Sequence, residues 1–228
     1  MHAAIEFQEV GFGYAPGDQV LKGITLSLAE GSFHVLTGAS GAGKSTLLKL
    51  CHLALRPRSG RMRLLGQDVA GLSRGAVTGL RRRIGMVDQD CQFLDHLDLR
   101  QNVALPRILR GDRPESYAED LADLITWVGL TGREAALPPE LSSGERQRAA
   151  LARAVIASPE VILADEPTGN VDARMGQHLL SLMVELNRLG KTVLIATHDL
   201  GLIRSARESV PVRLLRLSGG QIALGATL

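Results

Sequence analysis

The stretch Gly38–Ser45, GASGAGKS, constrains this chain more than any other, because it fits the pattern GxxxxGKS at every fixed position. An apolar run, Phe33–Leu36, comes before it, and a run with helical periodicity begins at Ser45. A strand, a glycine-rich turn and a helix start in this order point several backbone N–H groups at one spot, and the helix dipole adds positive potential there. The alternative is a glycine-rich turn without a ligand. The filled positions and correct flanks favour a phosphate-binding loop.

Each residue of this loop has a predicted role. Gly41 and Gly43 let the backbone approach phosphate oxygens that a Cβ would keep away. Lys44 supplies a cation for the β- and γ-phosphates of a nucleotide, and Ser45 supplies a hydroxyl ligand for Mg²⁺. The residues expected to hold the nucleotide here are Gly38, Ala39, Ser40, Gly41, Ala42, Gly43, Lys44, Ser45 and Thr46.

Length and composition bound the class of protein. With 228 residues, the chain is long enough for one α/β domain with a smaller lobe. A net charge of +2 and an aromatic content of 3% disfavour nucleic-acid binding, which draws on basic patches and stacking rings. Cys51 and Cys91 lack metal-ligand spacing, so we expect buried thiols in a reducing compartment. No apolar stretch approaches the ~20 residues that span a bilayer, and the N-terminus does not resemble a signal peptide. We expect a cytoplasmic protein, soluble or peripheral on a membrane.

Apolar patterning predicts a layered α/β fold. Alternating residues at Ile5–Val10 and Ile24–Leu28 predict an antiparallel β layer. Continuous apolar runs predict buried parallel strands at Ile84–Val87, Val161–Asp165 and Thr192–Thr197. Helical periodicity dominates between them. We expect a single domain, with residues 1–89 and 158–228 forming the β layer and P-loop core and residues 90–157 forming an inserted α-helical subdomain.

Polar residues follow the three predicted parallel strands, and the carboxyl ends of such strands meet at one edge of a sheet. Gln89, Asp165, Glu166 and His198 are the residues in question. Phosphoryl transfer to water needs charge neutralisation and a positioned base. Glu166 can deprotonate water, and Asp165 can reach Mg²⁺ through its water shell. Gln89 and His198 can contact the γ-phosphate and the metal. Taken singly, each residue could also be a loop amide, an acidic strand end or a capped histidine.

Two further features fit a nucleotide. The sequence LSSGE, Leu141–Glu145, can cap a helix with Ser142 or Ser143, and its hydroxyls and N–H groups form a second anion site. Tyr14 lies in a turn-rich segment ahead of the phosphate loop. Its ring either stacks on a purine or fills a crease on the surface, and the residues alone leave both readings open.

The order and spacing of these motifs resemble the ATPase subunits of ATP-binding-cassette (ABC) systems, over essentially the whole chain. The resemblance implies a RecA-like core and Mg-dependent ATP hydrolysis. It also implies a role for each motif. Gly38–Ser45 would be Walker A, Val161–Asp165 Walker B, Leu141–Glu145 the signature and Asn170–Asp172 the D-loop. Gln89 would be the Q-loop glutamine and a metal contact, Glu166 the general base and His198 the switch histidine.

The resemblance further implies a head-to-tail homodimer, in which one copy closes over the ATP that the other copy holds. The closing residues would be Ser142, Ser143, Gly144, Glu145 and Asp172. Two departures from the family pattern stand out. Ser143 replaces the first glycine of the usual signature, which predicts a weakened but working site. Asp88 replaces an aromatic residue before Gln89, which affects local packing.

Within the family, the phrases FLDHLDLRQNVALP, ADEPTGNVD and TVLIATHDLGLI look most like the bacterial cell-division branch. This likeness implies an integral membrane partner of the FtsX type and control of peptidoglycan hydrolysis at septation, from the cytoplasmic face of the inner membrane. Two alternatives stay open: the ATPase of a lipoprotein-releasing or macrolide or peptide export system, and a nucleotide-gated scaffold with vestigial hydrolysis. The apolar stretch Cys91–Leu105 is either a groove for the membrane partner or core of the helical subdomain.

Overall fold

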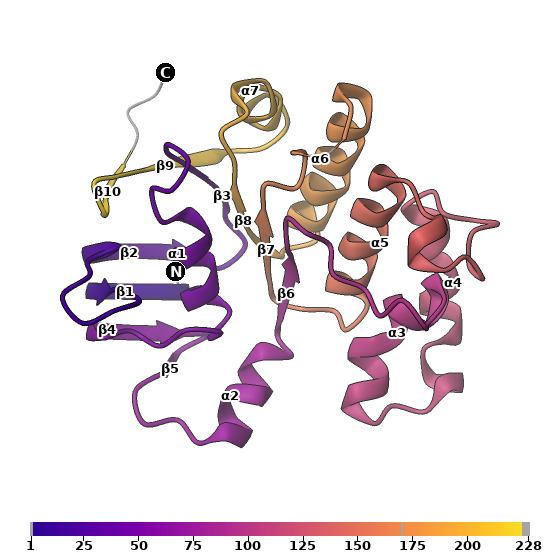
Figure 1. The fold of residues 1–228 in the computed structure, drawn as a ribbon, viewed down its shortest axis with the longest axis horizontal. Coiled ribbons are helices and arrows are strands. Elements are labelled where there is room, and N and C mark those ends of the chain that lie inside the picture. Colours follow the sequence, from indigo (N-terminus) through magenta and orange to yellow (C-terminus); the bar gives the residue numbers. More distant parts are fainter. Residues whose placement is uncertain (1, 170, 225–228) are drawn as a thin grey trace.

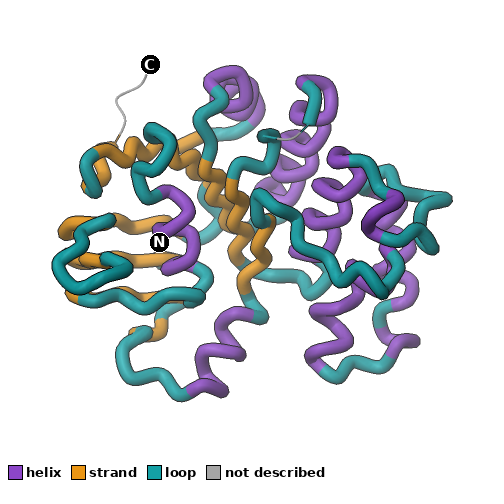
Figure 2. The backbone as a smooth tube through the Cα atoms, in the orientation of Figure 1, coloured by secondary structure: helices purple, strands orange, loops and turns teal. Residues whose placement is uncertain are grey.

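A computed structural model describes residues 2–169 and 171–224 of the chain. Figures 1 and 2 show a small sheet at one side, a larger sheet through the middle, and helices packed around the larger sheet and beyond it. The two sheets are built from different sequence patterns, and each pattern explains what the sheet packs against.

Alternating apolar residues build the small sheet. In β2 (Leu21–Ala29) the buried residues are Leu21, Ile24, Leu26 and Leu28. This strand pairs antiparallel with β1 (Ala3–Phe12), which pairs with β4 (Ser59–Leu64), and β5 (Gln67–Asp68) closes the order β2-β1-β4-β5. The buried face shares an apolar cluster with Leu47 and Leu48 of α1 (Lys44–Cys51). The small sheet therefore braces the helix that follows the phosphate loop.

Continuous apolar strands build the central sheet, as expected for a parallel sheet buried on both faces. Its order is β10-β9-β3-β8-β7-β6, and every residue of β7 and β8 is buried. The five strands from β9 to β6 run parallel, and β10 adds an antiparallel edge beside β9. The strands are β3 (Phe33–Thr37), β6 (Ile84–Val87), β7 (Val161–Asp165), β8 (Thr192–Ala196), β9 (Val212–Ser218) and β10 (Gln221–Leu224).

The remaining helices begin at side-chain caps in several places. Asp98, Ser142, Asp172 and Asp199 each accept a backbone N–H at the start of a helix. The helices are α2 (Arg74–Arg81), α3 (Leu99–Arg110), α4 (Ala118–Trp127), α5 (Ser143–Val155), α6 (Ala173–Arg188) and α7 (Leu200–Ser209), with 3₁₀ turns at Pro114–Ser116 and Pro138–Glu140. Helices α3, α4 and α5 gather on the side of the central sheet opposite the small sheet (Figure 1).

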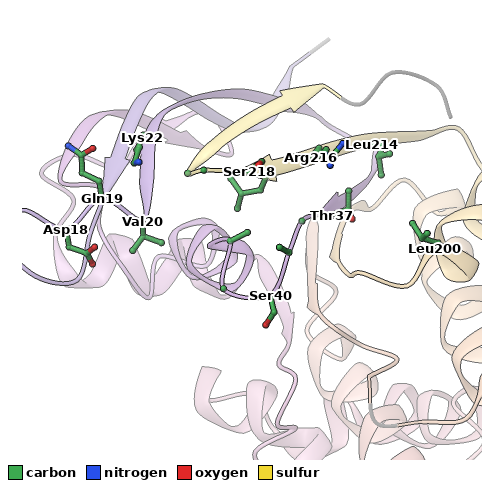
Figure 3. Close-up of a pocket in the computed structure, with 17 residues that line it drawn as sticks. Asp18, Gln19, Val20, Lys22, Thr37, Ser40, Leu200, Leu214, Arg216 and Ser218 are labelled. Carbon is green, nitrogen blue, oxygen red and sulfur yellow. The ribbon is translucent and has the colours of Figure 1, made fainter.

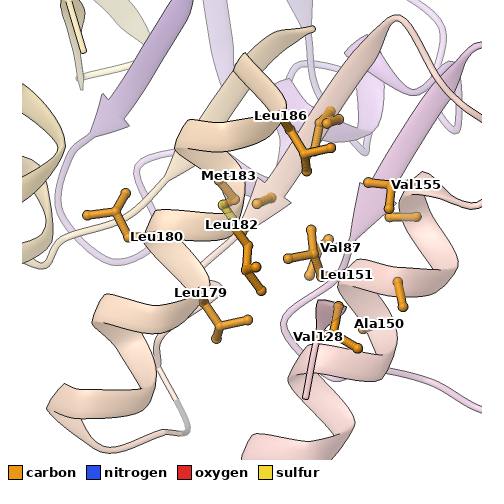
Figure 4. Close-up of a cluster of buried hydrophobic side chains, with 14 of the residues drawn as sticks. Val87, Val128, Ala150, Leu151, Val155, Leu179, Leu180, Leu182, Met183 and Leu186 are labelled. Atoms are coloured by element: carbon orange, nitrogen blue, oxygen red, sulfur yellow. The ribbon is translucent and has the colours of Figure 1, made fainter. Parts of the chain in front are cut away.

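One apolar cluster joins these helices to the central sheet. Figure 4 shows Leu151 and Val155 of α5 gathered with Leu182 of α6 and Val87 of β6, and Leu121 of α4 belongs to the same cluster. Helix α5 is therefore held by the sheet and by the neighbouring helices at once. The boundaries 1–89, 90–157 and 158–228 remain a prediction.

The structure confirms the predicted α/β fold, with its antiparallel layer and its helical segment after β6. Cys51 and Cys91 are buried free thiols, as expected, and burial raises the pKa of Cys51 to about 12. Helix α1 ends at Cys51, and Leu53 just after it adopts a positive φ of 57°, which stops the helix from continuing. Helix α7 and strand β10 were not predicted. Within the described ranges, no helix is long and apolar enough to cross a bilayer.

Gly85 of β6 tests the packing of α5 on the sheet. A Cβ at this position would lie 2.3 Å from the carbonyl oxygen of Ala154, a backbone atom that cannot yield cheaply. We expect Gly85→Ala to lower the free energy of unfolding by about 2 to 3 kcal/mol, measured by urea denaturation. Gly79, inside α2, is the control, because a Cβ there meets nothing within 4 Å and should stabilise the helix by about 1 kcal/mol. Equal midpoints for wild type and Gly85→Ala would contradict this packing.

Candidate nucleotide-binding site

The phosphate loop connects the end of β3 to the start of α1. Gly41 and Gly43 have φ of 75° and 103°, conformations that other residues rarely adopt, and a Cβ on Gly41 would point into open space. Gly38 has a different reason to be glycine, because its Cβ would lie 2.4 Å from the carbonyl oxygen of Leu217 on β9. The loop is thus shaped partly by its own turn and partly by its fit against the sheet.

A cavity of about 610 Å³ opens at this loop, within the range of small-ligand sites. It brings together most of the residues predicted to bind nucleotide or metal: Tyr14, Gly38, Ala39, Ser40, Gly41, Gly43, Lys44, Ser45, Thr46, Gln89, Asp165, Glu166 and His198. Val20 also lines it, a residue that no motif singled out. Ala42 lies outside this lining, as do Ser142, Ser143, Gly144, Glu145 and Asp172.

Lys44 and Glu166 form the charged centre of the cavity. The Lys44 side chain is almost fully buried, and its Nζ donates to the carbonyl oxygens of Gly38 at 3.0 Å and Ala39 at 3.3 Å. The same nitrogen lies 3.5 Å from Oε1 of Glu166, and this oxygen is 2.9 Å from Nδ1 of His198. The ammonium therefore sits where phosphate oxygens could replace the carboxylate as its partner.

Glu166 is held in an uncommon backbone conformation. Its φ is 45°, in the left-handed region, and its N–H donates to the carbonyl oxygen of Ala196 on β8 at 2.8 Å. Such strain persists only where the surroundings fix it, and it gathers at functional sites. Here it turns the chain sharply after β7, so that Asp165 ends the strand and Glu166 enters the cavity.

Asp165 has the features of a group that contacts a cation. It is 7% exposed, and its Oδ1 has no hydrogen-bond partner within residues 2–169 and 171–224. Burial raises the pKa of its carboxyl, and a hydrogen bond from Ser45 opposes that rise. Described His, Cys, Asp and Glu residues form no group of three that could hold a metal alone. A magnesium ion fits this place only with hydroxyl, amide, phosphate and water oxygens completing its shell.

Tyr14 lies at the rim of the cavity. The residue is 55% exposed, its ring meets the Phe12 ring edge-on at 5.1 Å, and its hydroxyl is 3.1 Å from Oγ1 of Thr46 at the start of α1. An exposed ring fixed at its hydroxyl end can present a face to a base, and it can equally fill a surface crease. Both readings remain predictions.

The second predicted anion site lies at the tip of α5. Ser142 caps this helix by accepting the N–H of Glu145 at 3.2 Å, while the Glu145 carboxylate accepts the N–H of Ser142 at 2.8 Å. This capping box uses the Ser142 hydroxyl and leaves Ser143 exposed. Gly144 packs beside Met175 of α6. Asp172 caps α6 and lies outside the cavity lining, and Asn170 lies outside the described residues.

A second, larger cavity of about 990 Å³ adjoins the phosphate loop on its other side. Figure 3 shows Lys22 of β2 and Ser218 of β9 on the strands bordering it, with Ser40 of the phosphate loop below Ser218 and Leu200 on the opposite side. Arg216 of β9 also lines it. Ser40 belongs to the predicted loop, but sequence reasoning missed Lys22, Arg216 and Ser218, because they carry no motif and lie on strands far apart in the sequence.

The chain matches the ABC transporter family over residues 21–169, more than half of its length, and so belongs to that family. It is an ATPase of this class. A dimeric ATP-binding cassette solved in a post-hydrolysis state with ADP and Pi has a TM-score of 0.88, at 29% identity over 98% of this chain and 100% of that one.

Among particular proteins, the chain resembles the cell division ATP-binding protein FtsE of Escherichia coli K12, with 43% identity over 218 residues covering 96% of each chain. It also resembles the macrolide export ATP-binding/permease protein MacB of Chromobacterium violaceum, with 37% identity over 95% of this chain but only 35% of that longer protein. Both likenesses cover the phosphate loop and the strand ends that line the cavity.

Asp165→Asn separates the stability of the fold from its chemistry. Because burial raises the pKa of Asp165, its ionised form destabilises the nucleotide-free fold at pH 7.5, and this cost fades as pH falls and the folded carboxyl binds a proton. We expect Asp165→Asn to unfold at a higher temperature than wild type at pH 7.5, with a smaller difference at pH 5. Mg-ATP turnover should fall at least about 100-fold. Unchanged turnover, or a lower melting temperature at pH 7.5, would contradict the cation role.

Proposed function

We propose that the protein is the ATPase subunit of a bacterial cell-division complex, working as a homodimer beneath an integral membrane partner of the FtsX type. The observation that carries the enzymatic part is the cluster of Lys44, Glu166 and His198 at the mouth of the phosphate loop. The observation that supports the cellular part is the 43% identity to FtsE over nearly the whole of both chains.

In the proposed reaction, the backbone of the phosphate loop and Lys44 bind the β- and γ-phosphates. Ser45, Gln89 and Asp165 would hold Mg²⁺, which neutralises developing charge on the phosphates. Glu166 orients and deprotonates the attacking water, since its carboxylate is free to turn toward water once Lys44 pairs with phosphate. His198 steadies Glu166 through Nδ1 and contacts the γ-phosphate from its exposed side.

The homodimer follows from what one copy lacks. The Ser142–Glu145 tip does not line the cavity of its own copy, yet it offers the exposed Ser143 hydroxyl and the backbone N–H groups of a helix start. We propose that this tip, with Asp172, covers the nucleotide of a second copy. The dimeric cassette described above is consistent with this arrangement. Hydrolysis per copy should therefore fall when the protein is diluted below its dimer dissociation constant.

The membrane partner is proposed to dock beside the Gln89 segment, defined here as residues 88–93. The structure divides the apolar stretch Cys91–Leu105 into two kinds of residue. Cys91, Leu99 and Val103 belong to the core, whereas Leu94 is 45% exposed. Docking at Leu94 would place the protein on the cytoplasmic face of the inner membrane. Among the apolar residues of this stretch, Leu94 is the exposed one, and the others are buried or half-buried.

Export is the second candidate function, and the 37% identity to MacB favours it. In that case the membrane partner would be a permease of a macrolide, peptide or lipoprotein system. The vestigial scaffold is disfavoured, because the phosphate-binding lysine, the proposed metal-binding residues and the proposed base line one cavity. The membrane protein that copurifies with the chain would separate division from export.

Glu166→Gln tests the base. The amide keeps the size of the side chain but cannot accept the proton of water, so we expect turnover to fall about 100-fold or more while ATP still binds. The variant should also accumulate as a nucleotide-bound dimer, measured by light scattering after gel filtration. Glu208→Gln, an exposed change on α7, is the control and should behave like wild type. Full turnover by Glu166→Gln would show that Glu166 is not the general base.

Leu94→Asp tests the docking surface. Phe93 and Leu97 of the same stretch are half-buried, and Phe93 packs against the core, so a charge there would disturb folding as well as docking. At Leu94, we expect about tenfold weaker recruitment to membranes that contain the FtsX-type partner, with ATP binding unchanged. Leu189→Asp, at a residue 74% exposed after α6, is the control. Equal recruitment of both variants and wild type would move the docking surface elsewhere.

A further inference from the structure

The Gln89 segment is fastened to α5, the helix that carries the signature tip. The thiol of Cys91 donates to Oε1 of Gln147 on α5 at 2.6 Å and contacts the carbonyl oxygen of Asp88 at 3.4 Å. Cys91 itself has a φ of 42°, so the backbone turns back on itself at this contact. Figure 1 shows the chain leaving β6 and crossing toward α3 alongside α5.

Arg153 makes the second attachment. Its guanidinium donates to the carbonyl oxygen of Gln92, and its Cζ lies 4.5 Å from the centre of the Phe93 ring. A planar cation that binds a carbonyl oxygen and covers an aromatic face fixes both the position of the backbone and the orientation of the ring. Together, Gln147 and Arg153 contact three consecutive residues of the segment, Cys91, Gln92 and Phe93, the first of which comes two positions after Gln89.

Gln147 is placed there at a cost to the fold. Its side chain is 3% exposed, and its Nε2 has no hydrogen-bond partner among the residues that the structure describes. A buried donor without a partner destabilises the folded state, and an apolar side chain of similar size would avoid this cost. Packing alone therefore does not account for an amide at this position.

We propose that Gln147 and Arg153 are positioning residues for Gln89, and that they make the Gln89 segment and the signature tip of one copy move together. The inference rests on the proposed function, because it assigns these residues to the ATP reaction. Ser143 and Arg153 are ten residues apart on one helix, or about 15 Å. A rigid helix thus joins the glutamine in one copy's cavity to the serines that cover the other copy's nucleotide.

Gln147→Leu gives the sharpest test, because activity and stability should move in opposite directions. It removes the acceptor of the Cys91 thiol and the unpartnered Nε2 together. We expect kcat to fall about tenfold, the Kd of ATP for the isolated copy to stay within about twofold, and the melting temperature to hold or rise. A purely structural role predicts instead that the melting temperature and kcat fall together.

Arg153→Lys adds an independent variant that keeps the charge and loses the planar fork. We expect kcat to fall about tenfold here as well. Arg188→Lys is the matched control, because Arg188 also donates to a backbone carbonyl, that of Ser209, but far from the cavity. Cys91→Ser should retain more activity than Cys91→Ala, since a hydroxyl can still donate to Gln147.

Thiol labelling reports the link directly in the unmodified protein. Maleimide reaction at Cys91, read by mass spectrometry, should change rate when a non-hydrolysable ATP analogue and Mg²⁺ are added, and should be faster in Gln147→Leu. Cys51 is fully buried in α1 and serves as the internal reference whose rate stays constant.

The inference is overturned if Gln147→Leu and Arg153→Lys turn over ATP like wild type, or if Cys91 labelling ignores both nucleotide and the Gln147 change. This outcome differs from failure of the proposed function. If the unmodified protein does not hydrolyse ATP, the proposed function is contradicted, and Cys91 labelling still tests the contact between the Gln89 segment and α5. If it does hydrolyse ATP and the variants match it, only the positioning role of Gln147 and Arg153 is contradicted.

Discussion

The contact between the Lys44 ammonium and the Glu166 carboxylate organises the cavity on which the proposed activity depends. The cation is shared by two loop carbonyls and one carboxylate oxygen, the latter 3.5 Å away. Both charges are largely withdrawn from solvent, where they attract each other more strongly than they would in water. A triphosphate brings stronger acceptors for Lys44 and so leaves Glu166 available to water.

Much of the fold can be understood as holding this contact in place. The small sheet packs against α1 and fixes the base of the phosphate loop, while β7 and β8 deliver Asp165, Glu166 and His198 to the same edge. The strained φ of Glu166 is fixed by its hydrogen bond to Ala196. The α5 tip does not line this cavity, which is why the tip of a second copy enters the proposal.

The sequence predicted the cavity better than its surroundings. The positions of Gln89, Glu166 and His198 followed from the rule that parallel strands end at one edge, and this rule needs no side-chain detail. Glycine patterns were less informative. Gly38 must be glycine because a Cβ would clash with the Leu217 carbonyl oxygen on β9, and sequence spacing does not reveal this contact. The ties from Cys91 and Gln92 to α5 were also out of reach, because they join residues 56 and 61 positions apart that carry no recognisable motif.

In the proposed mechanism, nucleotide held by the loop of one copy reacts only under the α5 tip of another. Mixing two inactive variants distinguishes this arrangement from one in which each copy works alone. Lys44→Ala removes the phosphate-binding lysine of the loop, and Ser143→Asp keeps a stable helix start but repels phosphate. Each should be nearly inactive alone, and their mixture should regain ATP turnover, because a mixed dimer contains one intact loop facing one intact tip. Full activity of Ser143→Asp alone, or no recovery in mixtures shown to form mixed dimers, would contradict the account.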